Sequence, residues 1–163
     1  RCFDLAYDSS LPVYIRLGKA DRGDVHNSKL TFNLGDLITL KASQGKRRVS
    51  IVATGSMVKM ASHLCDHFPS LGLVSAPSLK PINEDQIREI CKINDCLITL
   101  EEHSVIGGLG SILAEIAAPI LDIEIQKIGI QDKFSEYCGT YEYLLGEHKI
   151  DFESVKAVIY KHL

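Results

Sequence analysis

Three consecutive polar side chains, Glu101-Glu102-His103, are of the types that general acid–base catalysis uses most often. They directly follow residues 96–100 (CLITL), a continuous apolar run typical of a strand buried on both faces. The carboxyl ends of such strands are where α/β folds usually place ligands, so an acid–base pair is one interpretation of the triplet. More often, such polar residues only mark the place where a buried strand reaches solvent, and we favour this interpretation.

Four small residues, Gly107, Gly108, Gly110 and Ser111, follow the triplet and open a predicted helix. Backbone N–H groups at the start of a helix can hold an anion. The GGxG spacing differs from the GxGxxG dinucleotide motif, and small residues also let a helix pack closely on a sheet, which we favour. The carboxylates just before the glycines would repel a phosphate. We therefore predict that residues 101–111 form an interface between domains or subunits, with an anion-binding loop as the alternative.

Arg16 ends an apolar stretch, PVYIR, that predicts a strand over 12–17. A strand-end arginine can present its planar guanidinium to a carboxylate or a phosphate. The alternative is a surface ion pair with Asp21 or Asp24. Because the sequence contains no GxSxG motif and no Cys–His pair that can be picked out, no catalytic residue is predicted.

The histidines and cysteines predict no metal site. His63 and His67 have a spacing that can bind a metal, but they lie on the polar face of a predicted helix, and HLCDH lacks the glutamate of HExxH. The five cysteines are odd in number and include no CxxC motif, so we expect free thiols in a reducing, cytoplasmic setting.

Size and charge limit the classes of partner. The 163 residues fit one domain with a remnant of a second, and a net charge of -3 argues against a nucleic-acid partner, which needs a basic face. No run approaches the roughly 18 apolar residues of a membrane helix, so no membrane partner is expected.

The elements that must position these residues alternate between strand and helix from residue 48 onward. Ser56, Asn83 and Asp151 are the predicted N-caps of three of the helices. Besides 12–17, the predicted strands cover residues 36–41, 48–53, 71–75, 96–100 and 122–128, the last with the alternation of an edge strand. Strand–helix alternation implies parallel pairing, so we predict a three-layer α/β/α sandwich of about five strands.

Four phrases, in the right order, resemble the transketolase C-terminal domain family. TLEEHSVIGGLGSILAEIAA at 99–118 is similar to the family's VEEH and GGLGS signature. VSIVATGSMVKMA at 49–61 resembles its first strand, turn and helix, and IGIQDKFSEYCGTYEYLLGEHKID at 128–151 resembles its closing segment. PVYIRLGKAD at 12–21 is similar to the last strand of the pyrimidine-binding domain that precedes it. The similarity covers nearly the whole chain.

The resemblance implies a five-stranded, mostly parallel sheet in which one strand, at 36–41, is antiparallel. It divides the chain into residues 1–35, the end of the pyrimidine-binding domain with a linker, and residues 36–163, the transketolase C-terminal domain. It also implies a parent transferase of carbohydrate metabolism that uses thiamine diphosphate and Mg²⁺. That enzyme would transfer a two-carbon ketol unit between sugar phosphates.

The family's cofactor-binding segments lie outside this chain, so the resemblance implies that the chain alone is inactive and binds no cofactor. Arg16 matches the family arginine that contacts the substrate's phosphate, although YIRLGK stands here in place of the common LSRQNLP. The implied partners are the remaining cofactor-binding domains or subunit, a second copy in a homodimer, and a phosphorylated sugar.

Two groups of alternatives remain. Deoxyxylulose-phosphate synthase and the β subunits of 2-oxo acid dehydrogenases have similar C-terminal domains, so either could be the parent. A stand-alone regulatory or anion-binding module, which keeps the fold without a catalytic partner, is the alternative from a different functional class.

Overall fold

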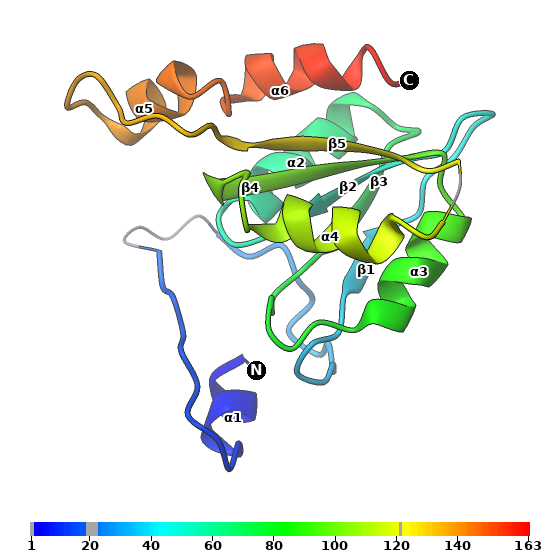
Figure 1. The fold of residues 1–163 in the computed structure, drawn as a ribbon, viewed down its shortest axis with the longest axis vertical. Helices are drawn as coiled ribbons and strands as arrows, with labels where there is room; N and C mark the ends of the chain where they lie inside the picture. Colours follow the sequence, from blue (N-terminus) through cyan, green and yellow to red (C-terminus); the bar gives the residue numbers. More distant parts are fainter. Residues whose placement is uncertain (1, 19–22, 121) are drawn as a thin grey trace.

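A five-stranded mixed sheet forms the middle layer of the computed structural model, which describes residues 2–18, 23–120 and 122–163 (Figure 1). The strand order is β1-β3-β2-β4-β5, where β1 pairs antiparallel with β3 and the other neighbours are parallel. The strands are β1 (Ile38–Lys41), β2 (Val49–Ala53), β3 (Gly72–Ser75), β4 (Cys96–Ser104) and β5 (Glu124–Ile130). The predicted fold class, with its single antiparallel strand and β5 at an edge, is confirmed.

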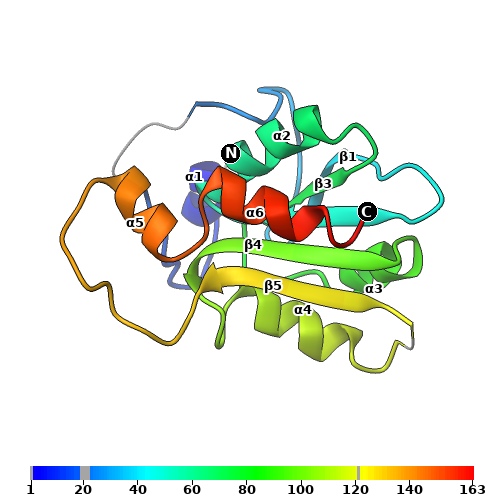
Figure 2. The same cartoon turned by 90° about the horizontal axis from the view of Figure 1, so that it is seen from above.

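Helices cover both faces of the sheet (Figure 2). One face carries α2 (Met57–His67), α5 (Tyr141–Glu147) and α6 (Phe152–Ile159), and the other carries α3 (Glu84–Lys92) and α4 (Leu109–Ala117). Within the described residues, no helix combines the length and apolar character needed to cross a membrane.

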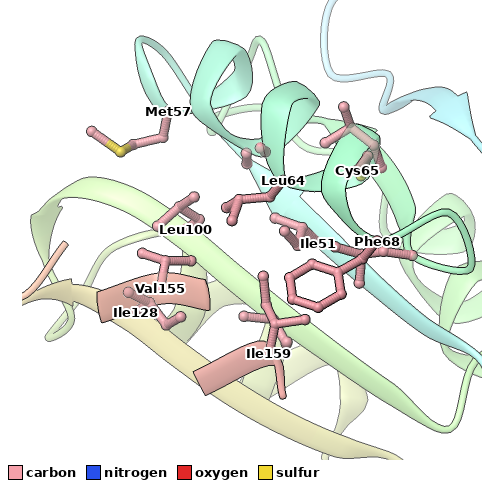
Figure 3. Packing of buried hydrophobic residues seen from close by; sticks show 14 of the residues in the cluster. Ile51, Met57, Leu64, Cys65, Phe68, Leu100, Ile128, Val155 and Ile159 are labelled. Atoms are coloured by element: carbon pink, nitrogen blue, oxygen red, sulfur yellow. The ribbon is translucent and has the colours of Figure 1, made fainter. Parts of the chain in front are cut away.

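Alternation along the central strands divides the core in two. Ile51 and Leu100 point toward α2 and α6, where they meet Leu64 and Ile159 (Figure 3). Leu97 points to the opposite face and belongs to the cluster under α3 and α4. Because successive side chains of a strand alternate between faces, β4 serves both halves of the core. Its apolar residues are accordingly buried on both sides, as CLITL predicts.

The predicted strand at 12–17 is wrong. Residues 12–18 are extended but form no strand, and Val13 and Ile15 are 40% and 36% exposed. A strand needs a neighbour to pair its N–H and C=O groups, and no described strand lies beside this segment. It follows a short helix, α1 (Cys2–Tyr7), that extends away from the sheet in Figure 1.

Two of the three predicted helix caps are confirmed. The side chain of Asn83 accepts a hydrogen bond from Gln86 N at the start of α3, and Asp151 does the same for α6. Ser56 precedes α2 but makes no capping hydrogen bond. Its hydroxyl donates instead to Glu102, which comes from β4. This cap prediction fails because a carboxylate distant in sequence competes for the hydroxyl.

The start of α4 is held by a buried carboxylate. Glu101 is fully buried, and its two oxygens accept hydrogen bonds from the backbone N–H groups of Leu109 (2.8 Å) and Gly110 (2.9 Å). N–H groups in the first turn of a helix lack partners within the helix, and the helix dipole is positive there. Glu101 therefore ties α4 to the strand that precedes it.

We predict that Glu101→Gln lowers the free energy of unfolding by about 2–3 kcal/mol. The amide has one acceptor oxygen where the carboxylate has two, so a buried N–H of α4 loses its partner and the favourable charge disappears. Urea unfolding followed by circular dichroism measures the loss.

The neighbouring substitution Glu102→Gln is the matched control, because one amide oxygen can still accept both of the hydrogen bonds that Glu102 receives. This substitution should lower the free energy of unfolding by about 1 kcal/mol or less. Equal losses for the two variants would contradict the special role of Glu101.

Candidate functional site

The Glu101-Glu102-His103 triplet lies within β4, which continues to Ser104, and its side chains separate. Glu101 points to the α4 side of the sheet. Glu102 points to the other side, and His103 is exposed, with Nδ1 3.3 Å from the carbonyl oxygen of Ser104. Strand alternation thus sends the two carboxylates to opposite faces. The structure does not bring them together as an acid–base pair.

Glu102 joins three elements at the carboxyl ends of the strands. Its Oε2 accepts hydrogen bonds from the hydroxyl of Ser56, just before α2, and from the hydroxyl of Tyr141, the first residue of α5, at 3.0 Å. Ser56 could have been found from sequence, since it follows a parallel strand next to β4. Tyr141 carries no such signal, because the chain reaches it only after a long irregular segment.

A small cavity of about 130 Å³ lies beside Glu102, between β5 and α5. His148 lines it, and Nε2 of this side chain lies 2.8 Å from the hydroxyl of Ser135. The other ring nitrogen, Nδ1, is buried without a partner among the described residues. Ligand pockets usually measure about 300–1,000 Å³, so this cavity suits water better than a sugar phosphate.

Two glycines of the predicted loop, Gly108 and Gly110, lie against the sheet. A Cβ at Gly108 would collide with Glu101 Oε2, and a Cβ at Gly110 would stand 2.7 Å from Oγ1 of Thr99. Gly107 has a φ of +74°, a conformation that side chains disfavour, and it is exposed. The glycines therefore allow α4 to start close to the strand. An external anion at this helix start would have to displace the Glu101 carboxylate.

Ser111 fixes the shape of the connection between β4 and α4. Its hydroxyl donates to the carbonyl oxygen of Val105 and accepts from the N–H of Gly107, each at 3.0 Å. His103, Ile106 and Gly107 stay exposed, and the Ile106 side chain is 65% exposed. The segment is thus held from inside while presenting a short outward-facing edge.

Arg16, the other predicted site residue, belongs to the N-terminal part of the chain. It is exposed in the extended stretch 12–18, and no hydrogen bond or ion pair between described residues connects it with residues 101–111. Asp21, one of its two predicted partners, lies outside the described residues. The phosphate role of Arg16 stays a prediction.

Comparison with known proteins connects these features to a family. The family model "Transketolase, C-terminal domain" matches residues 39–155. The chain is 32% identical to a 1-deoxy-D-xylulose-5-phosphate synthase of Francisella philomiragia, covering 98% of this chain and 26% of that protein. It is 30% identical to one of the subunits of an apulose-4-phosphate transketolase of Actinobacillus succinogenes, covering 93% and 50%. It thus spans half or less of the length of these relatives.

Solved structures agree on the fold. A split-gene transketolase, described as an inactive tetramer, superposes with a TM-score of 0.88 and 34% identity. The superposition covers 99% of this chain and 53% of that one. A transketolase variant from Pichia stipitis superposes over 78% of this chain and 18% of its own with a TM-score of 0.58, and at 20% identity it shows the fold alone. The family model spans more than half of the residues of this chain. The chain therefore belongs to the transketolase C-terminal domain family.

Proposed function

We propose that this chain is the C-terminal, non-catalytic part of a transketolase-like enzyme that transfers a two-carbon ketol unit between sugar phosphates. The match to the family over residues 39–155 carries the proposal. Relatives named as one subunit of a transketolase and as a putative transketolase C-terminal section support a parent built from more than one polypeptide. The related split-gene protein, described as an inactive tetramer, supports the need for a further subunit.

Thiamine diphosphate and Mg²⁺ belong, in this proposal, to the parent's remaining domains or subunit. The described residues of this chain do not fit the pair. A diphosphate at the start of α4 would meet the Glu101 carboxylate, which already takes the N–H groups there. Mg²⁺ prefers an octahedral set of oxygen ligands, and the potential metal ligands that cluster in the described structure include a thiol and an imidazole. We derive no catalytic step from this chain.

The segment 101–111 acts, we propose, in assembly. Its outward edge contains His103, Ile106 and Gly107, while Glu101 and Ser111 hold the backbone from inside. A fixed backbone with an exposed apolar side chain loses little conformational entropy when another surface covers it. This edge would meet another domain or the second copy of a dimer.

Residues 1–35 belong, in the same proposal, to the preceding pyrimidine-binding domain and its linker, and Arg16 contacts the substrate's phosphate from there. The exposure of Val13, Tyr14 and Ile15 supports this division, because an extended apolar stretch is expected to be covered by the rest of a sheet. Residues 36–163 form the C-terminal domain.

A 1-deoxy-D-xylulose-5-phosphate synthase is the second candidate parent. A curated relative with that name is similar over 98% of this chain. Product analysis of the assembled enzyme separates the two candidates, since one yields ketol transfer between sugar phosphates and the other yields deoxyxylulose phosphate. If no catalytic partner of this chain can be found, the alternative of a stand-alone regulatory or anion-binding module is supported.

We predict that the assembled enzyme transfers ketol units in the presence of thiamine diphosphate and Mg²⁺, and that this chain alone does not. In the assembled enzyme, Arg16→Ala should lower kcat/KM for phosphorylated acceptors about 10- to 100-fold, the loss of one charge-assisted contact. Unphosphorylated acceptors should be unaffected. Arg48→Ala, at another exposed arginine, is the matched control. An equal loss on both acceptor classes would show that Arg16 is structural, and an assembled enzyme without ketol transfer would overturn the proposed function.

We also predict that His103→Ala weakens dimer association about tenfold, with turnover per dimer nearly unchanged. The side chain lies on the outward edge of the segment and not at a reacting centre. Analytical ultracentrifugation measures the association, and steady-state kinetics at concentrations above the dissociation constant measure turnover. His63→Ala, at an exposed histidine of α2, is the control. Turnover that collapses while the dimer persists would identify a catalytic segment instead.

A further inference from the structure

Three metal-ligating side chains converge at the amino end of the sheet. The Sγ of Cys96, a carboxylate oxygen of Glu124 and a ring nitrogen of His162 all lie within 4.8 Å of one another. Five residue steps along β4, from Cys96 to Glu101, separate this cluster from residues 101–111, a span of roughly 17 Å at strand geometry. The cluster is therefore distinct from the segment proposed for assembly.

Each ligand is placed by a separate structural constraint. Cys96 begins β4 and Glu124 begins β5, and the two are paired in the parallel register. His162 follows α6, in a turn where its N–H donates to the carbonyl oxygen of Ile159. Its side chain is only 11% exposed, and Nδ1 lies 3.2 Å from Oε1 of Glu124. The positions thus come from the sheet and the helix, and not from a flexible surface.

A cation already occupies the outer side of this cluster. Arg47 pairs through Nη2 with Oε2 of Glu124. The Arg47 side chain is 46% exposed, so it can turn toward solvent without disturbing the core. The electrostatics at this point favour positive charge, and a metal ion would compete with Arg47 for it.

We propose that Cys96, Glu124 and His162 form a Zn²⁺ site, with water as the fourth ligand. A thiolate, an imidazole and a carboxylate are the donors that zinc uses, and three protein ligands with one open position form a common tetrahedral arrangement. Ligand atoms around tetrahedral zinc lie roughly 3.3–3.8 Å apart, so these side chains need to close by about 1–1.5 Å at most.

Zinc binding has a defined proton balance at this site. Cys96 is a free cysteine, and its thiol proton must leave because zinc binds the thiolate. Coordination forms the Zn–S bond and releases that proton to solvent. The bound metal would link the turn after α6 to both β4 and β5.

Cobalt(II) substitution tests the proposal on the purified chain, because a thiolate ligand gives a charge-transfer absorption band that carboxylates and imidazoles do not give. The experiment uses a Cys2→Ser/Cys138→Ser background, which removes both exposed thiols. We expect one Co²⁺ per chain with the thiolate band, displacement by Zn²⁺, and a higher Tm in zinc. Cys96→Ser should abolish the band.

Two variants at the other ligand positions keep the test valid if Cys96→Ser does not fold. Glu124→Gln and His162→Ala should each weaken Zn²⁺ binding at least about 100-fold, beyond the loss of a supporting contact. Arg47→Gln should strengthen it about tenfold, because a like charge leaves the site. Cys91→Ser, at a buried cysteine outside the cluster, should leave the band intact.

The proposal is overturned if no thiolate band forms, if the band survives in Cys96→Ser, or if Arg47→Gln weakens binding. These measurements use no enzymatic activity. Their outcome is therefore independent of the proposed ketol transfer.

Discussion

The fully buried carboxylate of Glu101, which connects β4 with the start of α4, constrains much of this domain. A buried charge is costly unless hydrogen bonds and an opposite charge offset the loss of water. For Glu101 the two backbone N–H groups and the positive end of α4 supply both. The residues around it must be small, because a Cβ at Gly108 would collide with the carboxylate and one at Gly129 would stand 3.1 Å from its Cγ. Gly108 and Gly129 thus leave the space that this glutamate occupies.

The position of Glu101 determines what its neighbours can do. Strand alternation turns Glu102 to the opposite face, where it connects β4 with the starts of α2 and α5. The connection that follows is held at both ends, so His103 and Ile106 face outward from a rigid backbone. Such a surface suits an interface better than a reaction that needs converging acid and base groups. The buried carboxylate thereby supports the proposed role of this segment in assembly.

Local signals were predictable from the sequence. The apolar runs of the parallel strands and the caps at Asn83 and Asp151 depend on neighbouring residues alone, and the structure confirms them. The misplaced features depend on distant contacts. Ser56 donates to a carboxylate 46 residues away, and residues 12–17 form no strand because no described strand lies beside them.

The functional features also divide into those set by neighbouring residues and those set by distant contacts. The position of the triplet at a strand end could be predicted, but its extension into β4 and the opposite directions of Glu101 and Glu102 required the pairing of β4 with β5. The cluster of Cys96, Glu124 and His162 could not be predicted, because its members come from two strands and a turn after α6 and have no short spacing in the sequence. Only the parallel register and the packing of α6 bring them together.

Native-state hydrogen exchange of individual backbone amides tests the central claim about Glu101 most directly. The N–H groups of Leu109 and Gly110 stand in the first turn of a helix, where amides without an acceptor exchange readily with solvent. If the Glu101 carboxylate holds them, they should exchange only through global unfolding, as slowly as amides in the middle of β4. The amide of Ile106, in the exposed connection, should exchange much faster. Equal rates for Ile106 and the two α4 amides would contradict the account.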